Sequence, residues 1–226
     1  MIRVWDLADP RAPKCIKVLM EPGQSDFLIR EFITFDKQSK TLISLAQSGD
    51  SFRGREHIAS PKIWALDTPD ISPTPAWLFD DHAPSSAMAT SHKRDLIAVA
   101  GARNRLTLYS IAEKRGKIQR TLSIPPGYEI RHLAFSRDDG VLIGGTGDGR
   151  VVIWNLGAGN GAPSAAFDTG HKNRGPFNDD NRPTLDLLDI SDDHALLLTG
   201  SSEWKLEGGF GDPTLRIWRL DGLAPT

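Results

Sequence analysis

Three short stretches of this sequence carry residue types that chemistry could use. The turn from Asp189 to His194 gathers three carboxylates and an imidazole, a density that suits a hard cation such as Ca²⁺. The stretch Gly145–Gly149 is glycine-rich after an apolar run, as a phosphate-binding loop is. The stretch Gly49–Arg53 approaches the sharp turn that holds the nucleophile of serine hydrolases. Each kind of site needs a particular element to position it.

The elements around these residues argue against each kind of chemistry. The acidic turn recurs as SRDDG at 136–140 and SHKRD at 91–95, where it joins two strands. Gly145–Gly149 is followed by the apolar run VVIW, not by the helix whose N-terminus binds phosphate. Gly49–Arg53 ends in arginine where the hydrolase turn requires glycine. We therefore expect no catalytic residue, no metal site and no cofactor.

Composition narrows the class of protein and its partners. A chain of 226 residues with 39% hydrophobic and 25% charged residues is ordinary for a soluble globular protein. Its net charge of -2 argues against partners bound by electrostatics, such as nucleic acids or membranes. Cys15 is the single cysteine, which excludes an intrachain disulfide. The sequence has no apolar signal region and no run near the roughly 18 apolar residues of a membrane span, so it predicts a cytoplasmic protein.

The segment from Arg131 to Leu156 contains a unit that repeats along the chain. Its three apolar runs, LAF, VLIGG and VVIWNL, are separated by the polar turns SRDDG and GDG. Short runs that are rich in β-branched residues and bounded by Asp-Gly are typical of antiparallel strands joined by hairpins. No long segment shows a period of 3.6 residues, so the sequence predicts an all-β fold.

An aromatic residue marks the third strand of each copy of this unit. These residues are Trp5, Trp64, Tyr109, Trp154 and Trp218. The spacing from position 64 to 109, and from 109 to 154, is 45 residues each time. A period of about 40–45 residues with four strands per repeat is typical of propeller blades. A single blade buries neither face alone and must stack on its neighbours.

The third strands VWDL, KIWALD, VIWNL and RIWRL, with the turn in LAFSRDDG, resemble those of the WD40-repeat family. The resemblance covers the whole chain. It implies an all-β propeller of four-stranded antiparallel blades, three complete and two partial, at 1–26, 27–82, 83–127, 128–170 and 171–226. It also implies a non-catalytic scaffold that binds other proteins.

WD40 blades often carry a buried hydrogen-bonded set of His, Ser or Thr, Asp and Trp. In the copy around 131–156, three residues fit this set by resemblance: Thr146, Asp148 and Trp154. No histidine precedes that copy at the place the family uses. In the last copy the residues that fit, with insertions between them, are His171, Ser201 and Trp218. Because the sets are incomplete, we expect apolar packing to hold the blades together.

Three insertions interrupt the repeat, at 48–61, 172–184 and 203–213. They fall in connections that leave one end of a four-stranded blade, so we expect them on the same side. Long loops on a rigid scaffold are frequent binding sites. The predicted partner-binding residues are aromatic residues and arginines in these insertions: Phe52, Arg53, Arg55, Arg174, Phe177, Trp204 and Phe210. In the rival interpretation, the aromatic residues only pack their own loops onto the blades.

Two arrangements of the blades remain open at this point. We interpret the chain as part of a longer propeller, in which the incomplete end blades leave strand edges and apolar sheet faces unpaired and so favour self-association. The alternative is a closed ring of four blades in which the strand at 14–20 completes the last blade. Two other functions also remain open. One is a propeller enzyme with a central metal or quinone, which requires histidines or carboxylates from several blades. The other is a truncated fragment with no independent function.

Overall fold

The short apolar runs of this chain form β-strands in a computed structural model. The structure describes residues 2–20, 28–35, 40–50, 55–58, 61–71, 76–77, 85–93, 95–101, 105–111, 117–171, 185, 187–193, 195–201 and 214–220. Of these, residues 28–34, 46–50, 55–58, 76–77 and 201 are described by their backbone alone. Every regular element in this part of the chain is a strand in an antiparallel sheet, which confirms the predicted all-β class. Within the same residues, no helix is long and apolar enough to cross a membrane.

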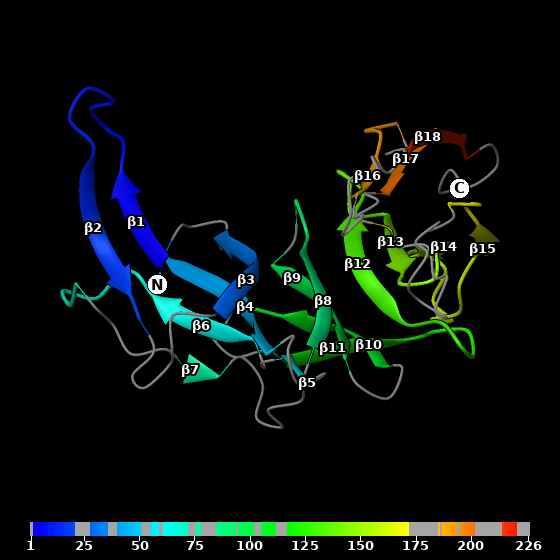
Figure 1. Cartoon of the computed structure of the whole chain (residues 1–226), viewed down its shortest axis with the longest axis horizontal. Coiled ribbons are helices and arrows are strands. Elements are labelled where there is room, and N and C mark those ends of the chain that lie inside the picture. The colour runs from blue at the N-terminus through cyan, green and yellow to red at the C-terminus, as the bar shows by residue number, and fades with distance from the viewer. Residues whose placement is uncertain are drawn as a thin grey trace. The chain divides into compact units, whose positions relative to one another are not determined.

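The chain divides into two compact units (Figure 1). The first consists of Met1–Ser85 and Ile111–Gly116, and the second of Ser86–Ser110 and Lys117–Thr226. Among the described strands, no sheet closes on itself. Each sheet draws its strands from one of the five segments that the sequence analysis separated.

The first unit contains a two-stranded and a five-stranded sheet. The two-stranded sheet pairs β1 (Ile2–Asp6) with β2 (Lys14–Leu19). The other sheet runs in the order β3-β4-β6-β7, with β5 paired to β4. Its strands are β3 (Leu28–Phe35), β4 (Thr41–Asp50), β5 (Arg55–Ile58), β6 (Lys62–Ala65) and β7 (Ala76–Trp77).

The insertion predicted at 48–61 extends a strand of this second sheet. β4 continues to Asp50, and its last four residues pair with β5, with Asp50 opposite Arg55. Paired strand therefore flanks residues 51–54 on both sides. This hairpin was not predicted from the sequence, because its residues are polar and show no apolar alternation, the signal that a strand with one buried face gives.

The second unit contains two four-stranded sheets and one three-stranded sheet. In all three, neighbouring strands follow one another along the chain, as in a meander. The first sheet contains β8 (Ser85–Thr90), β9 (Leu96–Gly101), β10 (Arg105–Ser110) and β11 (Lys117–Ser123). The second contains β12 (Ile130–Phe135), β13 (Val141–Thr146), β14 (Arg150–Asn155) and β15 (Ala165–Asp168). The third contains β16 (Leu187–Ile190), β17 (Leu196–Ser201) and β18 (Thr214–Arg219).

The pairing of β2 bears on the closed-ring alternative. In that alternative, the strand at 14–20 completes the last sheet by pairing with β18. Instead β2 pairs with β1, and β18 pairs with β17. The strand pairing that the four-bladed ring requires is thus absent from the described strands.

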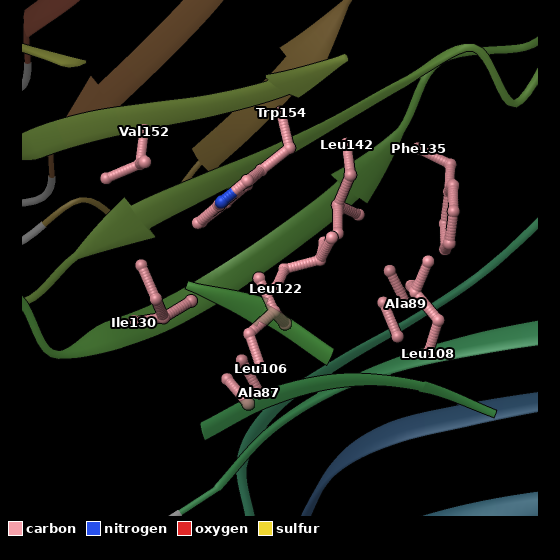
Figure 2. Packing of buried hydrophobic residues seen from close by; sticks show 12 residues of the cluster. Ala87, Ala89, Leu106, Leu108, Leu122, Ile130, Phe135, Leu142, Val152 and Trp154 are labelled. Carbon is pink, nitrogen blue, oxygen red and sulfur yellow. The ribbon is translucent and has the colours of Figure 1, made fainter. Parts of the chain in front are cut away.

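Apolar side chains join the first two sheets of the second unit (Figure 2). Leu106 and Leu108 of β10 pack with Leu142 of β13 and Trp154 of β14, and the Trp154 side chain is fully buried. Full burial of one large apolar side chain is worth roughly 1.5–3 kcal/mol. This interface therefore stabilises both sheets, neither of which could bury an apolar face alone.

The sheet β12–β15 is covered on both faces, and β13 is buried along its whole length. Val141 and Ile143 point away from Leu142, since successive side chains on a strand alternate between faces. They pack with Ile190 and Leu197 of the third sheet. A strand covered on both faces reads as a continuous apolar run, as VLIGG does.

A smaller core holds the two sheets of the first unit together. Ile2 and Val4 of β1 and Leu19 of β2 pack with Leu42 of β4 and Trp64 of β6. All five side chains are buried. Adjacent sheets thus meet through apolar faces in both units.

The third-strand aromatic residue distinguishes the two faces of each sheet. We name the face that carries this residue the aromatic face, and the opposite face the aliphatic face. In three described interfaces, the aromatic face of the later sheet packs on the aliphatic face of the earlier one. Their aromatic residues are Trp64, Trp154 and Trp218. Trp218 also packs against Phe167 of β15, with ring centroids 5.1 Å apart.

Candidate binding surface

The acidic turn from Asp189 to His194 is one of three copies of the same turn in the second unit. In each copy a serine hydroxyl accepts a hydrogen bond from the backbone N–H five residues further on. The donor–acceptor pairs are Leu96–Ser91 at 3.1 Å, Val141–Ser136 at 2.9 Å and Leu196–Ser191 at 2.9 Å. In the acidic copy, Asp193 accepts hydrogen bonds from the Ser191 hydroxyl at 2.6 Å and the Ala195 N–H at 3.0 Å. The aspartate completes the turn.

The other two carboxylates of this turn have separate partners. Asp192 forms an ion pair with Arg137 at 2.8 Å, in which both side chains are exposed. Asp189 accepts the N–H of Ile190 at 2.9 Å. In the described part of the chain, no group of three or more His, Cys, Asp or Glu residues could hold a metal ion.

These turns lie together at one end of the sheets of the second unit. Asp139 accepts backbone hydrogen bonds from His92 at 2.7 Å and Lys93 at 2.8 Å, which joins the first two turns. The pair between Arg137 and Asp192 joins the second turn to the third. The sheets are therefore stacked with their first connections on the same side.

The glycine-rich stretch 145–149 forms a hairpin turn that its own side chains fasten. The Thr146 hydroxyl donates to Asp148 and accepts the N–H of Arg150 at 2.8 Å. Asp148 pairs with the Arg150 guanidinium at 2.9 Å, and this guanidinium lies over the Tyr128 ring, 4.6 Å from its centroid. These groups fix the turn between β13 and β14, and Thr146 and Asp148 are not joined to Trp154.

Trp154 forms its polar contact with the preceding sheet. Its indole N–H donates to the carbonyl of Ser123, at the end of β11, at 2.9 Å. Gly144 lies beside the ring, and a Cβ at this position would lie 3.0 Å from both the Trp154 ring and the Ile130 side chain. The indole occupies the space that a side chain at position 144 would need. The three residues predicted as one set, Thr146, Asp148 and Trp154, thus divide between a turn and an inter-sheet contact.

The equivalent tryptophan in the first unit bonds within its own sheet. The indole N–H of Trp64 donates to the hydroxyl of Ser44 on β4 at 2.9 Å. Both side chains are buried. Ser44 follows Leu42, the residue paired with Trp64, by two positions, as Gly144 follows the Trp154 partner Leu142. Whether a hydroxyl or a glycine occupies this register position decides where the indole N–H finds its acceptor.

The last sheet carries a buried chain of polar side chains around His171. The indole N–H of Trp218 donates to the Thr199 hydroxyl at 2.9 Å, and His171 Nε2 lies 2.9 Å from the same oxygen. The other ring nitrogen, Nδ1, lies 2.9 Å from the hydroxyl of Thr214. The sequence analysis placed Ser201 in this set, but the hydroxyl that His171 and Trp218 share belongs to Thr199.

The surroundings of His171 favour the neutral imidazole. Burial lowers the pKa of His171 below its usual range, and the positive charge of Arg216 lowers this pKa further. A hydrogen bond with the backbone of Thr199 opposes the shift in part. A neutral ring has one donor and one acceptor nitrogen, and either can bond a hydroxyl, which donates and accepts. This arrangement fastens the last sheet to the segment before it.

The predicted partner-binding residues fall largely outside the described residues. Those outside are Phe52, Arg53, Arg174, Phe177, Trp204 and Phe210. Arg55 is the first residue of β5, whose backbone alone is described. In the last sheet, Leu187 pairs with Gly200 and Ser201 pairs with Thr214. The chain therefore enters β16 at the same end of the sheet where it passes from β17 to β18.

This end of the last sheet is opposite to the one with the acidic turn, since strands alternate in direction. The connections at 172–186 and 202–213 both meet the sheet there. In the preceding sheet, Thr169 donates from its N–H to the carbonyl of Gly149 at 3.1 Å, so the segment after β15 starts beside the β13–β14 turn. Two of the three predicted insertions are thus attached on one side. The third, 48–61, belongs to the first unit.

The aliphatic face of the sheet β16–β18 is an exposed apolar surface. Leu215 and Ile217 of β18 are 68% and 71% exposed. Leu187 and Leu196, on the same face of β16 and β17, are also exposed. Exposed apolar residues that adjoin one another mark interaction sites more often than single ones do. An unpaired apolar face on an incomplete end blade was expected from the sequence, but the residues that form it were not named, because an apolar strand has the same pattern whether or not another sheet covers it.

The five third-strand aromatic residues differ in exposure. Trp64 and Trp154 are fully buried, Tyr109 is buried on β10, and Trp218 is partly buried. Trp5 on β1 is 47% exposed.

The search of protein-family models finds none that matches the chain, and no curated protein matches it.

Proposed function

We propose that this chain is a non-catalytic protein–protein interaction scaffold, built of WD40-like blades that stack as in a β-propeller. The observation that carries the proposal is the repeated stacking of meander sheets, aromatic face on aliphatic face. Four-stranded meanders such as β8–β11 and β12–β15 are the unit of a propeller blade. The buried contacts of His171, Thr199 and Trp218 support the WD40 likeness, because that family uses the same residue types.

The binding surface in this proposal lies at the end of the last sheet where the chain enters β16 and passes from β17 to β18. Two long connections, 172–186 and 202–213, attach there and carry aromatic and arginine residues. Such residues contribute much of the binding energy at protein interfaces. The opposite end carries short turns of about five residues whose polar groups bond to one another, which leaves less surface for recognition.

The roles of the polar side chains favour a scaffold over an enzyme. The carboxylates and hydroxyls described above form hydrogen bonds within turns or accept them from indole N–H groups, and His171 is held between two threonines. A propeller enzyme with a central metal or quinone would need ligands that converge from several sheets. No such group of metal-ligating side chains occurs within the described residues.

The test compares capture of cell proteins by the full chain and by two variants. One variant combines Trp204→Ala with Arg174→Ala, which removes one aromatic side chain and one charge from the two long connections. The matched control is Lys93→Ala, which removes one charge from the opposite end while keeping the backbone N–H that Asp139 binds. We expect quantitative mass spectrometry to find partners that the control retains and the double variant loses.

Purified partners would then be titrated by calorimetry to measure Kd. Retention of every partner by the double variant, with loss in Lys93→Ala, would show that binding occurs at the end with the short turns. Conversion of a substrate by the pure chain, abolished by a substitution at His171 that leaves the chain folded, would contradict the scaffold proposal itself.

A further inference from the structure

The exposed apolar residues of β16–β18 come from all three strands: Leu187 of β16, Leu196 of β17, and Leu215 and Ile217 of β18. Gly200 lies between Leu187 and Leu215 in the strand pairing. A Cβ at Gly200 would lie 2.9 Å from Leu215 Cδ2 and 3.1 Å from Leu187 Cβ, so the two leucines close over the glycine. Ile217 pairs with Leu198 on the same face, next to Leu215 along β18. Asp189, opposite Leu198, and Arg219, opposite Leu196, lie on the same face, so the apolar patch consists of Leu187, Leu196, Leu215 and Ile217.

The same positions are buried in the other sheets of the chain. Ile217 and Leu215 come one and three residues before the aromatic residue of their strand. In the preceding sheet these positions are Ile153 and Val151, which are 1% and 0% exposed because the sheet β16–β18 covers them. In β10 they are Leu108 and Leu106, and in β1 they are Val4 and Ile2, all of them covered by the next sheet. Leu215 and Ile217 are thus apolar residues at positions that are buried in these other sheets, but in the last sheet they are exposed.

The sheet β1–β2 has the complementary feature. Its aliphatic face, with Ile2 and Val4, is buried against the next sheet of its unit. Its aromatic face carries Trp5, which is 47% exposed. At the equivalent positions, Trp64 and Trp154 are fully buried against the aliphatic face of the preceding sheet. Among the described strands, β16–β18 thus expose their aliphatic face and β1–β2 expose Trp5 on their aromatic face.

We propose that these two faces bind each other between copies of this chain. The aromatic face of β1–β2 in one copy packs on the aliphatic face of β16–β18 in a second copy, with Trp5 against Leu215 and Ile217. This contact continues the stacking that already joins β16–β18 to β12–β15 inside the chain. The two faces differ, so the contact is head-to-tail, and repeated contacts produce a closed ring or an open filament. The inference goes beyond the proposed scaffold function, which concerns other proteins bound at the long connections.

The experiment uses full-length variants that each disable one face. Ile217→Asp places a charge on the aliphatic face and Trp5→Asp on the aromatic face. The matched control is Ile118→Asp, at a position on β11 that is 55% exposed and belongs to neither face. Mass is measured by sedimentation velocity and light scattering over a concentration series. Thermal unfolding and circular dichroism check that each variant is folded, and Leu215→Asp and Trp5→Ser provide a second pair if either first variant is not.

We expect the wild type and Ile118→Asp to form larger species as concentration rises. Each face variant alone should remain at 24.8 kDa, the mass of one chain. An equimolar mixture of the two should form a species of twice that mass and nothing larger, since only one intact face of each kind remains. A wild type that stays monomeric at its highest soluble concentration would overturn the proposal, whether the faces bind within one chain or bind another protein. A Trp5→Asp variant that still dimerises, beside a monomeric Ile217→Asp, would also overturn it, because the aliphatic face would then bind its own copy.

Discussion

The buried carboxylate of Asp139 accepts a hydrogen bond from the backbone N–H of His92, 47 residues earlier in the chain, at 2.7 Å. The second carboxylate oxygen accepts the N–H of Lys93 at 2.8 Å. Asp139 has a φ of 60°, in the left-handed region that aspartate and asparagine tolerate better than most residues. Asp139 thus bonds within its own turn through its backbone N–H, which donates to the Ser136 carbonyl, and its side chain fastens the turn of the preceding sheet.

Replacing Asp139 by alanine should destabilise the second unit. The substitution removes two charge-assisted bonds, each worth about 1.5–3 kcal/mol, and places alanine at a positive φ. We expect a loss of roughly 3–6 kcal/mol in the free energy of unfolding, measured by urea denaturation. Asp139→Asn keeps one acceptor oxygen and should lose less. An alanine variant as stable as Arg137→Ala, an exposed control on the same turn, would contradict the role of the carboxylate.

Thr199 should prove necessary for the stability of the last sheet. Thr199→Val keeps the shape but leaves the Trp218 N–H and one His171 nitrogen without the hydroxyl they share. Leaving a buried polar group unsatisfied costs about 1–3 kcal/mol, so we expect a loss of that size. Thr199→Ser retains the hydroxyl and should lose clearly less. Equal losses in the two variants would show that the methyl group, not the hydrogen bonds, determines the effect.

Acidification should weaken the fold through His171. The folded-state pKa lies below the value of 6.5 expected for the unfolded chain, so the unfolded state binds more protons between these two values. This contribution to stability is fully present above pH 6.5 and is lost as the pH falls below it. One group can change the unfolding free energy by at most about 1.4 kcal/mol per pH unit.

The measurement compares thermal unfolding of the wild type, His171→Asn and His92→Gln between pH 7.5 and 5.5, a range chosen around the ordinary histidine pKa of about 6.5. We expect the stability of His171→Asn to vary less with pH than that of the wild type. His92→Gln, a substitution at an exposed histidine, should follow the wild type. The same slope in all three proteins would show that His171 does not titrate between the folded and unfolded states.

The strands were predictable because their side chains alternate between two apolar faces and their turns are marked by polar residues and glycine. The run VVIWNL predicted β14, which covers Arg150–Asn155, and TLRIWRL predicted β18. The pairing of β5 with the last four residues of β4 was not predictable in this way, because neither of these two segments shows an apolar pattern. That the partial last blade has an unpaired apolar face was expected, but the sequence alone did not assign this face to Leu215 and Ile217 of β18.

The sequence predicted Ser201 as the residue whose hydroxyl joins His171 and Trp218, whereas that hydroxyl belongs to Thr199, two positions earlier. Counting from Trp218 fails, because the connection between the second and third strands is a three-residue turn in one copy and a long insertion in another. The fourth residue of TLIS, VLIG and LLLT in the second strand identifies the position as Ser44, Gly144 and Thr199. The signal was present in the alignment of second strands. At Trp154, where glycine takes the place of the hydroxyl, the indole N–H bonds the carbonyl of Ser123 instead. This bond was not predictable from the sequence, because its acceptor is a backbone carbonyl of another sheet.

Introducing a hydroxyl at position 144 should therefore not stabilise the sheet β12–β15. Gly144→Ser would copy Ser44 in sequence, but its Cβ would lie 3.0 Å from the Trp154 ring, which already has an acceptor at Ser123. Overpacking of a filled core costs roughly 1–3 kcal/mol, and we expect a loss in that range. The companion variant, Ser44→Ala, should lose stability for the opposite reason, since the buried Trp64 N–H would have no hydroxyl acceptor.

Urea unfolding followed by tryptophan fluorescence measures both changes. Gly140→Ser, in the turn between β12 and β13 of the same sheet, where the nearest atoms belong to the Asp138 side chain and not to the core, serves as the control for adding a serine. The decisive comparison is between Gly144→Ser and this control. If Gly144→Ser matched or exceeded the wild type in stability, the Trp154 ring would have moved to bond the new hydroxyl, and the inter-sheet bond to Ser123 would not be what fixes the ring.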